Sequence, residues 1–442
     1  MSGADSYSAH VARLRGQYEE AMAGGFEGVL LHSGVGEHYF ADDREIAFQA
    51  FGHFGHWLPV NRPNQFLLIR PGRKPVYYQV VPADYWYEQD FPLDEAWGEA
   101  LDIQRLTSAG DLPRPGGNTA YLGPDARFAK ELGIAESHCN PAALLSRLDF
   151  ARAIKTPYES ARMRAANRLA AAGHEAARLC FLAGGGEFDI HLAFLEACRQ
   201  IEEELPYTPI IAIDEKSATL HYQHKRRQLP GPARVLLIDA GCRAGGYCSD
   251  VTRTWTSAQA HPLFVELVAG MDRLERELVA EVGPGGDYVE LHLSALGKLA
   301  DLLLELGICR GDRGQLFDAG VPQRFMPHGV GHLLGVQVHD VGGRQRGPGG
   351  GQRPPPPHSP ALRCTRTMVE DMAFTIEPGC YFIPMLLEPV RESAAAKLID
   401  WSLVDALYDH GGVRVEDNVR VTAAGAENFT RDCLGKPVPT TS

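Results

Sequence analysis

Apolar residues recur along the first third of the chain in short runs that are separated by turn-forming residues. The runs at 28–31, 66–69 and 76–78 are rich in Leu, Val, Ile and Tyr and are bounded by Gly, Pro and Asn. Such runs are typical of β-strands. Helical patterns lie between them, so this part of the chain is predicted to form a small α/β domain.

A helix start marks the end of this first part. Thr156 is an N-cap candidate, Pro157 occupies the first helical position, and Glu159 supplies the acid of a capping box. An Ala-rich helical pattern follows as far as Leu182, where three glycines stop it. We therefore expect two domains, at residues 1–155 and 156–442.

The second part mixes further helical and strand patterns. The pattern predicts helices at 190–204, 264–282 and 288–306, and strands at 235–238, 247–256, 373–376 and 412–421. Residues 342–360 are rich in Gly and Pro and are predicted to form a loop. An α+β fold class follows from this order of elements.

Four acids occupy positions where the strand pattern is otherwise apolar. Asp239 ends the run Val235–Ile238, and Asp250 follows a Gly-rich stretch at 241–246 that can close a hairpin. Two carboxylates packed together in a core need a cation, because burial and like charge both oppose their ionisation. The pair is therefore a candidate metal site.

The other two acids repeat this arrangement. Glu377 ends the apolar run 373–376, and Glu416 lies in the strand pattern at 412–421. The two-residue period of a strand places Arg414, Glu416 and Asn418 on one face. That strand would therefore carry a metal ligand with a cation beside it.

A glycine-rich segment with three histidines completes the candidate site. His328, His332 and His339 lie within it, and Gly329 and Gly331 disfavour a zinc-protease helix. Two divalent cations carry four positive charges, which would balance the four negative charges of the carboxylates. Ligation dominated by oxygen, with one imidazole, favours a hard ion such as Mn²⁺.

The composition and charge of the chain limit the classes of partner and the compartment that we expect. The 442 residues carry a formal net charge of -13, which disfavours nucleic acids and anionic membranes as partners. No signal peptide or membrane-spanning run is evident. The nine cysteines show no CxxC pair, which fits free thiols in a reducing compartment, so we expect a cytoplasmic protein.

Each acid or histidine taken alone is more often a surface residue or a structural ion-pair partner than a ligand. Four acids that interrupt apolar strands in one half of the chain, together with the histidine segment, are an improbable coincidence in a purely structural protein. The residues alone therefore favour a two-metal hydrolase.

At this point the segments resemble a known family. Asp239-Ala240-Gly241, Ser249-Asp250-Val251-Thr252-Arg253-Thr254, the His328–His332 segment, Glu377-Pro378-Gly379 and Arg414-Val415-Glu416-Asp417 occur in the order seen in pita-bread metallopeptidases. Further motifs, such as Leu220-His221-Tyr222 and Leu362-Arg363-Cys364, are similar to those of the bacterial prolidases (PepQ-type Xaa-Pro dipeptidases), a group close to the organophosphorus acid anhydrolases. The resemblance covers nearly the whole chain.

This resemblance implies a pita-bread catalytic domain with a smaller α/β N-terminal domain that makes dimer and active-site rim contacts. It implies a homodimer that hydrolyses dipeptides with a C-terminal proline by means of a hydroxide bridging two Mn²⁺ ions. The implied metal ligands are Asp239, Asp250, His332, Glu377 and Glu416.

The resemblance also assigns the other site residues. Glu377 would relay a proton, and His328 and His339 would stabilise charge on the carbonyl oxygen or position the substrate. Arg363, His221 and Arg414 would bind the proline carboxylate. The implied pocket residues are Tyr207, Leu220, Tyr288 and Leu362, and Asp43 and Trp57 would reach the partner's site.

Three alternatives stay open at this point. An Xaa-Pro aminopeptidase would accept longer peptides, a side activity on organophosphate triesters would use the same site, and a binding protein would keep the fold without metal. The loop at 342–360 and the segment at 385–399 depart from the family pattern, so they bear on substrate preference.

Overall fold

The computed structural model describes residues 3–23, 25–91 and 93–434, and they form two units. The N-terminal unit comprises the described residues up to Arg152, with 156–160 and 346–351. The C-terminal unit comprises 153–155, 161–345 and the described residues from 352 onward. No helix in the described residues is both long enough and apolar enough to cross a lipid bilayer.

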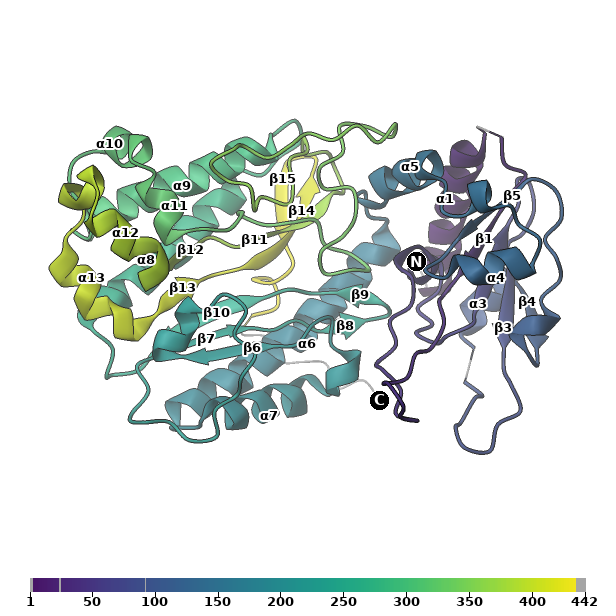
Figure 1. Ribbon diagram of the computed structural model, residues 1–442, viewed down its shortest axis with the longest axis horizontal. Helices are drawn as coiled ribbons and strands as arrows, with labels where there is room; N and C mark the ends of the chain where they lie inside the picture. The colour runs from purple at the N-terminus through teal and green to yellow at the C-terminus, as the bar shows by residue number, and fades with distance from the viewer. Residues whose placement is uncertain (1–2, 24, 92, 435–442) are drawn as a thin grey trace. The chain divides into compact units, whose positions relative to one another are not determined.

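The N-terminal unit is built on one mixed sheet with the strand order β4-β3-β2-β1-β5 (Figure 1). Its strands are β1 (Gly28–His32), β2 (Phe66–Ile69), β3 (Val76–Val80), β4 (Asp102–Leu106) and β5 (Thr119–Leu122). Its helices are α1 (Gly3–Met22), α2 (Gly52–Trp57), α3 (Glu95–Ala100), α4 (Ala126–Glu131) and α5 (Ala142–Arg152), with short 3-10 helices at Ala109–Asp111 and Glu136–His138.

Both faces of this sheet are covered. Leu30 and Leu68 pack with Ala129 of α4 in one cluster, whereas the intervening residues Leu31 and Leu67 are buried on the other face. The three strands expected at 28–31, 66–69 and 76–78 are therefore confirmed, and the α/β character of this part follows from two buried faces.

The capping box predicted at 156–159 is present. The Glu159 carboxylate accepts a hydrogen bond from the Thr156 backbone N–H at 2.7 Å, and the Thr156 hydroxyl accepts one from the Glu159 N–H at 3.3 Å. Helix α6 (Pro157–Leu182) starts there and ends at the predicted residue.

The C-terminal unit alternates helices with short strands. Its helices after α6 are α7 (Glu187–Cys198), α8 (Pro262–Ala280), α9 (Tyr288–Glu305), α10 (Arg313–Asp318), α11 (Val321–Phe325), α12 (Pro384–Arg391) and α13 (Trp401–Leu407). Its strands are β6 (Ile210–Ile213), β7 (Val235–Asp239), β8 (Arg243–Ala244), β9 (Tyr247–Cys248), β10 (Thr252–Thr256), β11 (Ala373–Ile376), β12 (Gly379–Tyr381), β13 (Gly412–Arg414), β14 (Asp417–Thr422) and β15 (Gly425–Asn428). Short 3-10 helices lie at Glu202–Glu204, Asp214–Ala218, Ala394–Leu398 and Tyr408–His410.

The strands form two three-stranded sheets, β10-β7-β6 and β11-β14-β15, and two two-stranded sheets, β12-β13 and β8-β9. Helices α6 and α7 pack on the first sheet through residues such as Phe181, Phe194 and Ile238. Helices α8 and α9 pack on β11, β13 and β14 in a larger cluster. The strands therefore lie between helices on both sides of this unit (Figure 1).

Three predicted elements differ from the structure. The helix expected at 190–204 ends at Cys198, because Arg199 adopts a left-handed conformation with φ of 58°. The strands expected at 247–256 and 412–421 are each interrupted, so Asp250 and Glu416 lie in the gaps between strands.

Candidate active site

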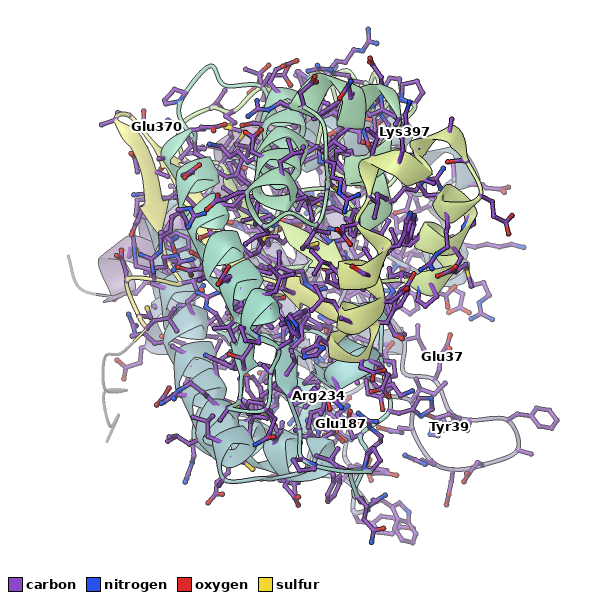
Figure 2. The ribbon with its side chains drawn as sticks, turned by 90° about the vertical axis from the view of Figure 1, so that its left-hand side faces the viewer. Glu37, Tyr39, Glu187, Arg234, Glu370 and Lys397 are labelled. Carbon is purple, nitrogen blue, oxygen red and sulfur yellow. The ribbon has the colours of Figure 1, made fainter. Side chains whose placement is uncertain are left out.

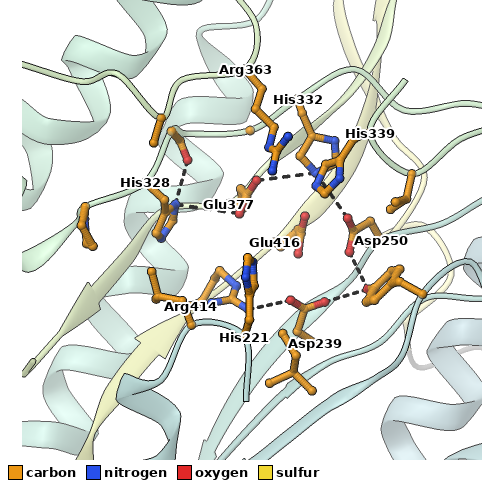
Figure 3. A pocket seen from close by; sticks show the side chains of 18 of the residues that line it. His221, Asp239, Asp250, His328, His332, His339, Arg363, Glu377, Arg414 and Glu416 are labelled. Carbon is orange, nitrogen blue, oxygen red and sulfur yellow. Dashed lines mark hydrogen bonds and ion pairs between the residues drawn. The ribbon is translucent and has the colours of Figure 1, made fainter. Parts of the chain in front are cut away.

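A cavity of about 440 Å³ lies in the C-terminal unit (Figure 3). Its wall contains all four acids that interrupt the apolar strands and the three histidines of the glycine-rich segment. The lining residues are Tyr207, Thr208, Ile210, Leu220, His221, Gln223, Asp239, Asp250, Pro327, His328, Gly329, Gly331, His332, Val338, His339, Ala361, Arg363, Glu377, Arg414 and Glu416.

Strand register brings two of the acids together. Thr252 pairs with Asp239 across β7 and β10 and forms an isolated bridge with Glu416 on its other side. Its hydroxyl also donates a hydrogen bond of 2.7 Å to Glu416. Asp250 is held by Asn418, whose side-chain oxygen accepts the Asp250 N–H at 3.0 Å.

The glycine-rich segment runs beside β11 and delivers His332 to the same place. Glu377 N–H donates to the Val330 carbonyl at 2.8 Å, and Thr375 N–H donates to the His332 carbonyl at 2.9 Å. These backbone bonds set His332 beside Glu377, with 3.7 Å between Nε2 and Oε1.

Gly331 allows the glycine-rich segment to lie this close to β11. A Cβ atom there would lie 2.1 Å from the Thr375 carbonyl oxygen and 2.3 Å from the Tyr288 hydroxyl, and the backbone φ is +153°. A side chain would therefore both clash and strain the backbone. Gly329 is similarly constrained, because its Cβ would lie 2.8 Å from Cα of Leu362.

The hydrogen-bonding groups of the cluster fit a divalent cation. The His332 Nδ1 lies 3.0 Å from the Leu333 carbonyl, which only accepts, so Nδ1 carries the proton. The Nε2 lone pair then faces Asp250 Oδ2 at 3.3 Å, and one Glu416 oxygen is buried without a hydrogen-bond partner among the described residues. Donor atoms of Asp250, His332 and Glu416 lie within 4.8 Å of one another, so these acceptors share a space that suits a metal ion.

The pKa values of the acids show the cost of this arrangement without a cation. Burial, and then the neighbouring carboxylates, raise the pKa of Glu416 well above its ordinary value and raise the pKa of Glu377 to about 7. Burial also raises the pKa of Asp239. Burial opposes ionisation of Asp250 as well, but without a metal ion a second proton on His332, whose own pKa is raised, donates to Asp250 and keeps the Asp250 pKa below its ordinary value. A bound cation would take the place of that proton on Nε2. Divalent cations would relieve the repulsion among all four groups.

Arg414 is paired with protein groups. Its side chain is 5% exposed, and its three nitrogens donate to Asp239 at 2.6 Å, Tyr381 at 2.8 Å and Thr252 at 3.0 Å. Arg414 lines the cavity and its guanidinium braces Asp239, so a further contact with the substrate carboxylate stays a prediction.

Two histidines face the cavity as neutral imidazoles. Burial lowers the pKa of His328 to about 3 and that of His339 to about 4. His328 Nδ1 donates to the Gly329 carbonyl at 2.8 Å, so its Nε2 accepts from the Tyr381 hydroxyl at 2.9 Å. The His339 ring packs edge-on against His332, with 4.4 Å between centroids.

The residues expected to bind substrate divide into three groups. His221, Leu220, Arg363 and Tyr207 line the cavity, and the Tyr207 hydroxyl lies 2.7 Å from Asp239 and 2.5 Å from Asp250. Tyr288 and Leu362 are fully buried behind the glycine-rich segment and do not line the wall, which corrects their expected role.

The third group belongs to the N-terminal unit. Asp43 is exposed on the segment between β1 and α2. Trp57 is 1% exposed and packs edge-on against Tyr18 of α1, so its side chain is part of that unit's own core. This burial corrects the expectation that Trp57 reaches another subunit.

Thr252 and Tyr381 were not singled out from the sequence, although they hold Glu416, Arg414 and His328. Both residue types are common in strands, so the pattern carries no signal for their hydroxyl groups. The pairing of β10 with the segment around Glu416 shows the role of Thr252, and the pairing of β12 with β13 places Tyr381 beside Arg414.

Known proteins resemble this chain over almost its whole length. Residues 161–423 match the model of metallopeptidase family M24, and residues 5–150 match that of the Xaa-Pro dipeptidase N-terminal domain. The Xaa-Pro dipeptidase of Marinobacter nauticus is 43% identical over 97% of this chain and 98% of its own length. That of Shewanella sediminis is 40% identical over 96% and 98%.

Solved structures with the same fold include the aminopeptidase PepP of Pseudomonas aeruginosa, with a TM-score of 0.73 and 22% identity over 98% of this chain and 96% of that one. The proline aminopeptidase P II of Yersinia pestis has a TM-score of 0.73 and 20% identity over 99% and 98%. The expected pita-bread fold with an N-terminal domain is confirmed. By these matches the chain belongs to metallopeptidase family M24, among the bacterial Xaa-Pro dipeptidases.

Proposed function

We propose that this protein is a cytoplasmic Xaa-Pro dipeptidase that hydrolyses dipeptides with a C-terminal proline and uses two Mn²⁺ ions. The observation that carries the proposal is one cavity that combines a cluster of four acids and an imidazole with an unpaired arginine at its edge. Among the described residues, Arg363 has no hydrogen-bond or ion-pair partner, and its side chain points into this space (Figure 3).

Asp239, Asp250, His332, Glu377 and Glu416 would hold the ions. When bound, the two ions act as Lewis acids and make water reactive at neutral pH. Four of these five ligands are carboxylates, and ligation dominated by oxygen favours Mn²⁺ over softer ions. Thr252 and Arg414 keep Glu416 and Asp239 in place by the bonds described above.

Glu377 is the proposed proton carrier. It lies at the end of β11 beside His332, and a carboxylate that lines the cavity can accept a proton and return it during one turnover. The proton would pass to the proline nitrogen as the Xaa-Pro bond breaks. His339 would stabilise the carbonyl, because a neutral imidazole can donate a hydrogen bond to the oxygen on which charge develops. His328, whose N–H is taken by the Gly329 carbonyl, would help to position the substrate.

Arg363 and His221 would bind the proline carboxylate. A tertiary amide has no N–H for recognition, so a charged group that binds the carboxylate is a direct way to hold the dipeptide in place. A cation at this place also disfavours longer peptides, whose next residue replaces the free carboxylate.

The test is to compare Leu-Pro with Leu-Pro-Leu as substrates for chelated enzyme reloaded with Mn²⁺, using wild type and Arg363→Ala. The proposal predicts that wild type prefers the dipeptide and that the substitution raises KM for Leu-Pro about 10- to 100-fold, while bound Mn²⁺ is unchanged. Preference for the tripeptide in wild type, or equal loss of substrate and metal binding in the variant, would contradict it.

We also propose that two copies associate through the N-terminal unit. Its segments 35–46 and 85–87 expose Tyr39, Phe40 and Trp86 at 48, 101 and 76% (Figure 2 labels Tyr39), an unusual number of exposed aromatic side chains. Asp43 lies in the same segment. Sedimentation analysis should show a dimer that Phe40→Ser with Trp86→Ser converts to monomer; a monomeric wild type would refute this.

A further inference from the structure

The Gly/Pro-rich loop that departs from the family pattern contacts the segment that carries Arg363. We call residues 342–345 and 352–353 the loop base, and residues 359–365 the Arg363 segment. The Arg363 side chain is exposed, whereas Leu362 and Cys364 on either side of it are fully buried. The backbone of Arg363 is thus anchored by its neighbours, and its guanidinium is free to bind a ligand.

Arg344 of the loop base holds the peptide bond that precedes Arg363. Its Nη2 and Nε donate to the Leu362 carbonyl at 2.7 and 3.1 Å, and Nη2 also donates to the Pro360 carbonyl at 3.2 Å. A planar guanidinium that holds two carbonyls fixes the orientation of the backbone more strictly than an ammonium group can.

Gly343 and Arg353 hold the other side of Arg363. The Gly343 carbonyl accepts the Thr365 N–H at 2.9 Å, and a Cβ on Gly343 would lie 2.7 Å from the Arg363 carbonyl oxygen. Arg353 donates to the Thr365 carbonyl at 3.1 Å, and the Thr365 hydroxyl donates to the Arg353 carbonyl at 2.8 Å. The loop base therefore contacts the backbone on both sides of Arg363.

We infer that the loop base positions Arg363 and thereby sets the preference for a free substrate carboxylate, with Arg344 as the main positioning residue. The inference deepens the proposed function and rests on it. A fixed backbone limits the directions in which the long Arg363 side chain points, so less conformational entropy is lost when a carboxylate binds. This role accounts for the glycine and the arginines of the loop base. Gly343 permits the close approach to the Arg363 carbonyl, and Arg344 and Arg353 supply the hydrogen-bond donors.

The experiment compares Arg344→Met with the control Arg346→Met, both assayed on Leu-Pro and on Leu-Pro amide, which lacks the carboxylate. Arg346 is a suitable control because its side chain has no hydrogen-bond or ion-pair partner among the described residues. We expect Arg344→Met to lower kcat/KM about tenfold for Leu-Pro through KM, and to leave the amide, bound Mn²⁺ and Tm unchanged. Arg344→Lys, which keeps the charge, should show most of the same loss.

The double variant Arg344→Met with Arg363→Ala should be no worse on Leu-Pro than Arg363→Ala alone. Equal losses of Leu-Pro and amide turnover in Arg344→Met and Arg344→Lys, or wild-type kinetics in both, would overturn the inference while Arg363→Ala still upheld the carboxylate clamp. If instead Arg363→Ala kept the full preference for the free carboxylate, the proposed clamp itself would fail, and the inference with it.

Discussion

Replacing Glu377 by Gln should have opposite effects on the stability of the metal-free and the metal-loaded protein. Glu377 is 19% exposed at its side chain and lies among three other carboxylates. Burial, and then Asp250 and Asp239, raise its pKa from 4.5 to about 7. A neutral amide of the same shape removes the cost of ionising this group when no cation is bound.

The magnitude follows from the linkage of proton binding to folding. The folded pKa exceeds the unfolded pKa, so the folded state binds the proton more tightly, and stability is lost as pH rises from 4.5 to about 7. At 1.36 kcal/mol per pH unit, the metal-free wild type loses about 3 kcal/mol by pH 8 and under about 1 kcal/mol at pH 5. Glu377→Gln should recover most of this difference at pH 8.

The assay is calorimetry of chelated protein at pH 5 and pH 8, repeated after Mn²⁺ is added. In the metal-free state the variant should melt about 3–5 °C above wild type at pH 8 and close to it at pH 5. With Mn²⁺ the order should reverse, because the variant loses a negatively charged ligand. A metal-free variant that melts below wild type at pH 8, or by the same margin at both pH values, would refute the reasoning.

Two further substitutions test the groups that support the site. The fully buried Asp417 forms ion pairs with Arg253 at 2.6 Å and with Arg431 at 2.5 Å. Asp417→Asn should therefore lower the free energy of unfolding, measured by calorimetry, by about 3–5 kcal/mol. A loss below about 1 kcal/mol would contradict this. Gly331→Ala should lower both bound Mn²⁺ and kcat at least about tenfold, since its Cβ would lie 2.1 Å from the Thr375 carbonyl; normal metal content by elemental analysis would refute the steric argument.

The sequence pattern identified the elements that bear the site because burial marks them strongly. Apolar runs that end in an acid, as at Asp239 and Glu377, correspond to β7 and β11, and both side chains line the cavity. The long helices α6, α8 and α9 lie within two residues of their expected bounds, because their apolar periodicity extends over many turns.

Contacts between distant parts of the chain determine the features of the site that the sequence pattern did not predict. The break in the strand at Glu416 depends on its bridge to Thr252, which lies 164 positions away in the chain. The role of Arg414 depends on Asp239 and Tyr381, and no local pattern distinguishes a guanidinium that braces a ligand from one that binds substrate. Distant neighbours, rather than local propensity, assign these roles.

The central claim is that one imidazole and four carboxylates hold two divalent cations in this cavity. Anomalous diffraction from crystals grown with Mn²⁺ tests it most directly. We predict two Mn²⁺ peaks in the cavity, held by Asp239, Asp250, His332, Glu377 and Glu416. No peak in the cavity, or one ion held by other side chains, would contradict the account.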